Sequence, residues 1–235
     1  MCVAGFAGGA ARGWHDNVAR ISTASGSVSP MEAPQSPGAP ASAPPFAEPT
    51  PLGLLGLAVG CAALLPIAFG QALTPAAFRT AAMYCLLFGG GCQFLAGVMA
   101  LANKNLLGGT LFTTFAFNWV INYLTLKGLS EGVVPDSHVV LAVDVCFLVI
   151  FVVLTFAFGF FSKLLFAFLL DIDVLFACRI AREVTHAPAF ALPIALATVA
   201  LMGIALWLAF AILVNSAAGR TVFVVPGPLF KPGPA

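Results

Sequence analysis

The sequence contains very little charge. Of its 235 residues, ten are Lys or Arg and nine are Asp or Glu, so the formal net charge is only +1. This balance gives no reason to expect a nucleic acid or a strongly charged partner. Hydrophobic residues make up 60% of the chain and the mean hydropathy is +1.03. A soluble domain does not need that much apolar surface, so the composition indicates an integral membrane protein.

Residues that serve metal, redox or nucleophilic chemistry are also scarce. There are three His, and the six Cys are scattered without a CxxC pair. Zinc and redox sites need clustered Cys and His, so the sequence predicts no metal site and no cofactor. A membrane enzyme built on Asp171, Asp173 and His186 is disfavoured because no clustered metal or nucleophile motif accompanies them.

The first 48 residues lack any long apolar run, whereas six such runs follow. Residues 1–48 are rich in Pro, Ala and Ser, and their few large apolar side chains would not offset the entropy of ordering, so this tail is predicted to be disordered. The later runs are continuous rather than alternating, which favours helices and excludes a β-barrel. They cover residues 52–69, 81–101, 106–126, 139–161, 164–181 and 189–214. The prediction is an all-α, six-transmembrane-helix bundle over residues 49–227, with a short C-terminal tail at 228–235.

One predicted helix carries a regular polar stripe. Thr110, Thr114, Asn118 and Asn122 follow one another at four-residue spacing, which places them on one helix face. They either join helices, as Thr and Asn do in membranes, or line a wet path. The unbroken period favours the path, and hydroxyls and amides suit a carboxylate passenger without trapping it. Gln93, in the preceding run, fits both interpretations.

Glycines are concentrated in the first two predicted helices. They are Gly53, Gly56, Gly60, Gly89, Gly90, Gly91 and Gly97. Small residues let membrane helices approach closely, which is the favoured interpretation. The alternative is a hinge or an unwound segment whose backbone groups bind the substrate.

Three aspartates lie inside apolar runs, where carboxylates are costly and usually functional. They are Asp144, Asp171 and Asp173. Asp171 and Asp173 lie about 200° apart on a helix, so they do not share a face. One hypothesis is that Asp171 or Asp173 carries a coupling proton. The other is a structural pair with a cation such as Arg179 or Lys163.

Three blocks of the chain resemble the acetate uptake transporter family, which includes bacterial succinate–acetate permeases and fungal acetate permeases and ammonia-export proteins. EPTPLGL at 48–54 is similar to the family's NPAPLGL. FGGGCQFLAG and the residues to Trp119 are similar to FGGxxQxxAG…KGNTFGxTAF…W, and NSAAGRTV at 215–222 is similar to NExxGRTV. The matching positions include Pro49, Pro51, Gly53, Gly89, Gly90, Gly97, Asn105, Trp119, Asn215, Gly219 and Arg220.

The resemblance implies a six-helix bundle, usually oligomeric, with a pore inside each protomer that moves acetate and similar short monocarboxylates. Proton coupling and channel-like passage are both consistent with the family. The family's apolar constriction corresponds to Leu57, Phe115 and Ile172. The implied partners are a small monocarboxylate, protons, the lipid bilayer and further copies of the chain.

The chain departs from the family pattern at positions that bear on the passenger. Glu48 replaces an Asn, Ala100 replaces an acidic residue, Phe115 replaces a Tyr, Asn118 replaces a Phe, and Ser216 replaces a Glu. One rival function is ammonia or ammonium movement, to which some members of the family are linked. The changes at Glu48, Ala100 and Ser216 leave a membrane regulator that transports nothing as another rival. The plasma membrane is the default location and an organelle membrane is the alternative. Lys and Arg are too evenly divided among the loops to set the orientation.

Overall fold

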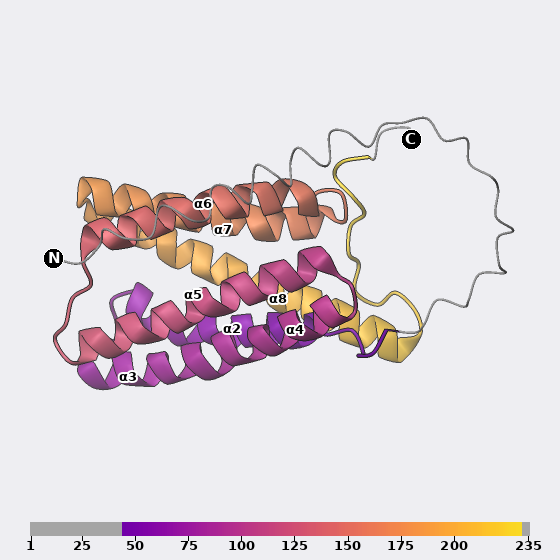
Figure 1. The fold of residues 1–235 in the computed structure, drawn as a ribbon, viewed down its shortest axis with the longest axis horizontal. Helices are drawn as coiled ribbons and strands as arrows, with labels where there is room; N and C mark the ends of the chain where they lie inside the picture. Colours follow the sequence, from indigo (N-terminus) through magenta and orange to yellow (C-terminus); the bar gives the residue numbers. More distant parts are fainter. Residues whose placement is uncertain (1–43, 232–235) are drawn as a thin grey trace, which may run out of the picture. The chain divides into compact units, whose positions relative to one another are not determined.

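The computed structural model describes residues 44–231, and over that range every regular secondary-structure element is a helix (Figure 1). The all-helical class is therefore confirmed. The predicted disordered tail falls outside the described residues as far as position 43. The long helices are α2 (Thr50–Ala68), α5 (Leu106–Ser130), α6 (Ser137–Phe158), α7 (Lys163–Thr185) and α8 (Ala191–Ala218). A further rod joins α3 (Pro75–Tyr84), the π-helix η1 (Cys85–Cys92) and α4 (Gln93–Ala102), and a 3-10 turn, η2 (Pro188–Phe190), precedes α8.

Capping residues fix where the helices begin. The side chains of Asn105, Asp136 and Ser162 accept hydrogen bonds from backbone N–H groups in the first turns of α5, α6 and α7, at 2.9, 3.0 and 3.1 Å. The second helical rod begins at Pro75, earlier than the predicted residue 81. Its Thr74 hydroxyl accepts from the Ala77 N–H at 3.2 Å, and proline at the first helical position suits the helix geometry.

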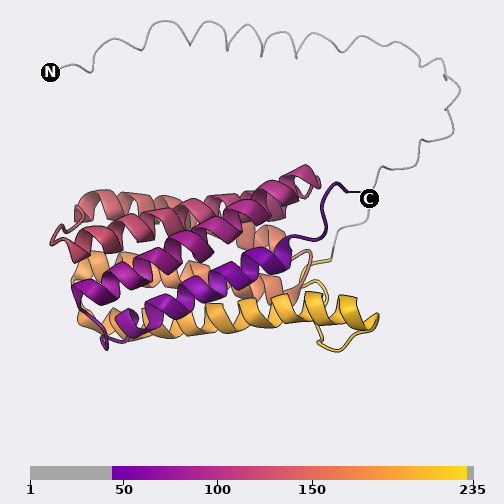
Figure 2. The same cartoon turned by 90° about the horizontal axis from the view of Figure 1, so that it is seen from below.

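Two groups of helices are held together by α8. The first group contains α2, the α3–η1–α4 rod and α5, and the second contains α6 and α7. The last helix, α8, packs along α2 and also along α7 (Figures 1 and 2). Helices α5 and α6, although consecutive, touch one another little. Side chains therefore have room to face one another between the two groups.

Glycine allows the close approach of α2 to α5 and η1. A Cβ added at Gly60 would lie 2.9 Å from the Trp119 ring, and one at Gly56 would lie 2.5 Å from the backbone oxygen of Phe88. The packing interpretation is confirmed at the glycines where an added Cβ would lie closer than 3.0 Å to a neighbouring atom, which are Gly53, Gly56, Gly60, Gly89 and Gly97. Residues Gly89, Gly90 and Gly91 lie within η1, so the backbone there is a widened helix and not the unwound segment considered as the alternative.

The NSAAGRTV motif turns the chain back across the bundle end. Gly219 ends α8 with φ 61°, a conformation that glycine adopts without strain. The side-chain oxygen of Asn215 accepts hydrogen bonds from the backbone N–H groups of Val222 and Phe223. Its side-chain NH2 group donates to the backbone oxygen of Phe223. The following segment reaches the α6–α7 turn, where the Lys163 N–H donates to the Gly227 oxygen at 2.9 Å.

Four helical segments are long and apolar enough to cross a membrane: Thr50–Ala68, Pro75–Ala102, Ser137–Phe158 and Pro188–Ala218. Helices α5 and α7 have 25 and 23 residues, which is sufficient length, but they carry the polar stripe and the aspartates. Many large apolar side chains on the helix surfaces are exposed, as contact with lipid requires. The chain is an integral, multi-pass membrane protein.

Candidate transport path

A cavity of about 520 Å³ lies between the C-terminal half of α5, the N-terminal half of α6 and the end of α7. It forms because α5 and α6 separate beyond their connecting loop. Its wall is mixed. Polar lining comes from Asn118, Asn122, Thr125, Ser137, Asp144, Arg179, Arg182 and Glu183, and apolar lining includes Val140, Val143 and Phe147. A cavity with these two kinds of surface suits a small molecule with a polar and an apolar end.

The structure brings half of the predicted polar stripe to this cavity. Asn118 and Asn122 line it, with Asn118 only 6% exposed at its inner end. Thr110 and Thr114 are half-buried nearer the beginning of α5 and do not line it. Thr125 extends the stripe toward the cavity mouth. The sequence contained that signal, because Thr125 lies three residues beyond Asn122 on the same helix face.

The three residues of the expected constriction belong to one buried cluster. Leu57, Phe115 and Ile172 are 1%, 5% and 1% exposed, on α2, α5 and α7. The rings of Phe115 and Phe151, on α5 and α6, are in a T-shaped arrangement with their centroids 5.3 Å apart. The Phe151 ring in turn stacks on Phe176 of α7 at 5.5 Å. Aromatic side chains thus fill the space between the helix groups, one turn beyond Asn118.

Sequence patterns do not identify Phe151 and Phe176 as part of this cluster. Each lies in a run with many other phenylalanines, so its type and spacing carry no distinguishing signal. Their role follows only from the rotation that packing imposes on α6 and α7.

Some buried polar atoms in the interior have no protein partner. Among the described residues, these atoms are Gln93 Oε1, Trp119 Nε1, Asp171 Oδ2 and Asp173 Oδ1. Unpartnered buried polar groups are rare in folded proteins and need an explanation. Gln93 is 1% exposed at the start of α4, so it faces neighbouring helices rather than lipid.

The two aspartates of α7 have different surroundings. Asp173 Oδ2 accepts a 2.7 Å hydrogen bond from the Thr155 hydroxyl on α6. Asp171 is half-buried and makes no hydrogen bond or ion pair within residues 44–231. Within residues 44–231, neither aspartate forms an ion pair with Arg179 or Lys163, and Arg179 pairs with Asp144 instead.

The Arg179–Asp144 pair joins α7 to α6 at the cavity wall. Arg179 Nε donates to Asp144 Oδ2 at 3.1 Å, and the guanidinium carbon lies 5.4 Å from the centre of the Phe176 ring. Asp144 is 5% exposed, and the Arg179 side chain is 28% exposed. A buried carboxylate beside an arginine is thereby electrically compensated.

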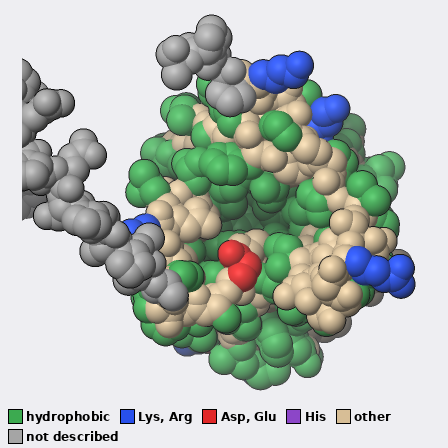
Figure 3. Space-filling view, turned by 90° about the vertical axis from the view of Figure 1, so that its right-hand side faces the viewer, with side chains coloured by type: hydrophobic (Ala, Val, Ile, Leu, Met, Phe, Trp, Pro, Cys, Tyr) green, Lys and Arg blue, Asp and Glu red, His purple; other side chains and the backbone are tan. Residues whose placement is uncertain are grey.

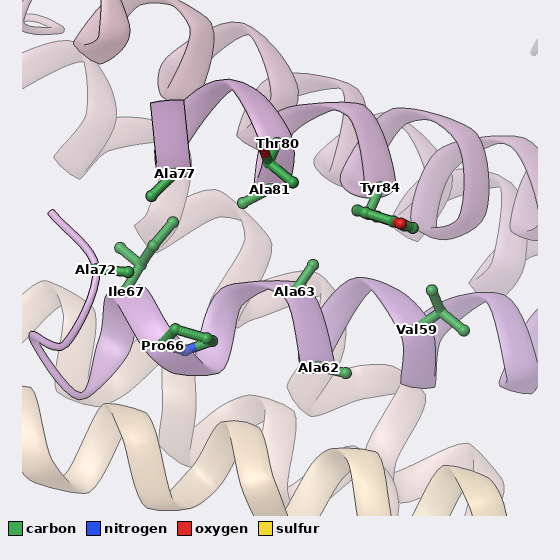
Figure 4. A pocket seen from close by; sticks show the side chains of 10 residues that line it. All are labelled: Val59, Ala62, Ala63, Pro66, Ile67, Ala72, Ala77, Thr80, Ala81 and Tyr84. Carbon is green, nitrogen blue, oxygen red and sulfur yellow. The ribbon is translucent and has the colours of Figure 1, made fainter. Parts of the chain in front are cut away.

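A second cavity lies elsewhere, between α2 and α3. It has a volume of about 450 Å³ and is lined mainly by small apolar side chains, with Thr80 and Tyr84 from α3 (Figure 4). None of the predicted path residues lines it. It is therefore separate from the polar cavity.

The bundle end where α2 and α7 begin is also hollowed. Figure 3 looks onto this end and shows a central depression with hydrophobic walls, with acidic atoms beside it and Lys or Arg side chains around the rim. The polar cavity described above opens near the α5–α6 loop, at the other end. The buried aromatic cluster lies between the two.

Within residues 44–231, the structure is an all-helical membrane bundle in which a polar cavity lies beside a buried apolar cluster. Among solved structures, the fold is similar to that of the bacterial acetate channel SatP, with a TM-score of 0.69 and 22% sequence identity. The similarity covers 77% of this chain and 99% of that chain. The resemblance predicted from the sequence is thus confirmed at the level of the fold. No family model matches the chain, and no curated protein matches it in sequence.

Proposed function

We propose that the chain crosses the membrane with six helices and moves acetate or another short monocarboxylate through a path inside each protomer. The observation that carries this proposal is the polar cavity of α5, α6 and α7, which ends on the apolar cluster around Phe115. The fold of an acetate channel supports the same passenger class. Transport, rather than catalysis, is the proposed activity.

The two zones act on different parts of the passenger. Amide groups of Asn118 and Asn122 donate hydrogen bonds to a carboxylate and replace part of its hydration shell. The aromatic cluster of Phe115 and Phe151 has no polar side-chain atoms, so it favours a passenger with a methyl end and opposes bare ions by excluding water. Leu57 and Ile172 are proposed as further walls of this narrow zone.

Proton coupling is a second part of the proposal. Asp171 and Asp173 lie in the middle of α7, where burial penalises the charged carboxylate. One of them taking up a proton with the passenger would make transport depend on the proton gradient. Assembly into a homo-oligomer and placement in the plasma membrane remain predictions.

Uptake of labelled acetate into liposomes that contain the purified protein tests the proposed function. Uptake that saturates and exceeds that of protein-free liposomes is expected. An outside-acidic gradient should increase it if a carboxyl on α7 carries a proton inward, whereas indifference to the gradient would favour a channel-like path. If acetate uptake equals the background, the acetate assignment fails, and ammonia movement in the same liposomes then separates that rival from a regulator.

A further inference from the structure

We propose that Arg179 is a binding site for the carboxylate group of the passenger at the mouth of the polar cavity, and that Asp144 positions its guanidinium. This inference rests on the proposed function and names the residue that first takes up the charged end of a monocarboxylate. It arises from a pair that neither the sequence analysis nor the constriction uses.

The contacts of Arg179 leave one side of its guanidinium free. The Nε–H group is used by Asp144, and one face lies over the Phe176 ring. Within residues 44–231, the two terminal nitrogens make no hydrogen bond or ion pair with the protein. Arg179 lines the cavity, so a carboxylate there is able to accept two parallel hydrogen bonds from this side of the guanidinium.

The ion pair is poorly explained as a structural tie alone. An ion pair that only joins two helices is most stabilising when the guanidinium contacts the carboxylate through two nitrogens. Arg179 contacts Asp144 through Nε only. Asp144 is almost fully buried while Arg179 is partly exposed to the cavity. This arrangement fixes the arginine by one edge and presents the other.

The charges around the cavity favour reversible binding. Arg179 and Arg182 are balanced by Asp144 and Glu183, all four of which line the wall. An anion therefore meets directed donors without a large excess of positive charge, and it is able to leave again. A site with unopposed arginines would hold the passenger more tightly and slow its transport.

The neighbouring side chains suit a short alkyl group. Val140, Val143 and Phe147 line the same cavity from α6. Arg179 lies in the last two turns of α7, which ends at Thr185. Asn118 lies near the middle of α5, so it is deeper in the bundle. A carboxylate released by Arg179 would meet Asn122 and then Asn118 before reaching Phe115.

The concentration of labelled acetate that half-saturates uptake into liposomes tests this site. Arg179→Gln should raise it by about 10-fold or more, because two charge-assisted hydrogen bonds are lost. Arg179→Lys keeps the charge without the planar donor pair and should recover only part of the affinity. Arg79→Gln is the control, since it removes the same charge from an exposed residue of α3 that does not line this cavity, and its effect should stay within about twofold.

An exchange variant separates binding from a structural tie. Asp144→Arg combined with Arg179→Asp keeps an ion pair between α6 and α7 but moves the guanidinium. If the pair is purely structural, the acetate concentration that half-saturates uptake should be the same in the exchange variant as in the parent, and that result would overturn the inference. If Arg179 binds the carboxylate, this concentration should be as high as for Arg179→Gln. If the exchange variant does not fold, Arg179→Lys distinguishes the same two roles. A structural pair predicts parental half-saturation for Arg179→Lys, and the binding site predicts a higher value.

Direct binding provides a readout that does not depend on transport. Saturation transfer from the solubilised protein to the acetate methyl group should be strong for the parent chain and much weaker for Arg179→Gln. If the parent takes up acetate and Arg179→Gln has parental half-saturation and parental saturation transfer, this inference alone fails. If the parent takes up no acetate, the proposed function itself fails.

Discussion

The hydroxyl of Thr155 on α6 donates a 2.7 Å hydrogen bond to Oδ2 of Asp173 on α7. Both residues are buried, and the second carboxyl oxygen of Asp173 has no partner among the described residues. The bond therefore provides the polar contact that Asp173 makes in the helix interface. It couples the hydrogen bonding of α7 to the packing of α6.

Thr155→Val should destabilise the protein by about 1–3 kcal/mol, because it leaves a buried carboxyl group without its donor. The measurement is thermal unfolding of the purified protein in detergent, monitored as the loss of monodispersity. Thr198→Val is the matched control. Thr198 is equally buried, but its hydroxyl bonds to the Ile194 carbonyl of its own helix, so a smaller effect is expected. Equal losses for the two variants would contradict the importance assigned to the contact with Asp173.

Gly60→Leu should destabilise the interface of α2 and α5, because even a Cβ at Gly60 would lie 2.9 Å from the Trp119 ring. Overpacking of this kind typically costs about 1–3 kcal/mol. Gly203→Leu provides the control, since a Cβ there meets nothing within 4 Å. Thermal unfolding of both variants in the same detergent checks the prediction, and it is contradicted if Gly203→Leu is the less stable of the two.

Phe115→Leu should shift selectivity toward longer monocarboxylates, because a smaller side chain widens the aromatic cluster. The ratio of butyrate to acetate uptake is expected to rise on the order of 10-fold. Phe117→Leu is the matched control, as its side chain is 58% exposed on the outside of the bundle. An unchanged ratio for Phe115→Leu, in a protein that still takes up acetate, would remove Phe115 from the path.

Asp171→Asn and Asp173→Asn test the proton hypothesis. A carboxyl that carries a proton inward is loaded more often when the outside is acidic, so uptake by the parent should rise with an outside-acidic gradient. The variant of the carrier residue should take up acetate at a rate that no longer responds to the gradient. If both variants keep the full response, neither aspartate is the proton carrier.

The helices could be predicted from the sequence because long apolar runs determine them locally. The start of the second helical rod could not, since its Thr74–Pro75 cap lies among small and polar residues outside the apolar run. The turn at 103–105 is predicted, and the structure shows Asn105 capping α5. These features depend on a few neighbouring residues, which sequence patterns describe well.

The site was only partly predictable, because it depends on how helices rotate against one another. The spacing of Asn118 and Asn122 predicts a shared face, and the structure places both in one cavity. The Asp144–Arg179 pair joins residues 35 positions apart, and no spacing rule links them. The same limit applies to Phe151 and Phe176, whose meeting with Phe115 is set by the packing of three helices.

The most direct test of the proposed path is whether the passenger crosses the polar cavity, measured as acetate uptake after modification of a cysteine at position 118. With Asn118→Cys, a charged thiol reagent should block uptake, and excess acetate should slow the modification. The parent chain and Phe117→Cys, treated alike, should lose little activity, because residue 117 faces outward. Full acetate uptake after complete modification of Asn118→Cys would contradict the proposed path.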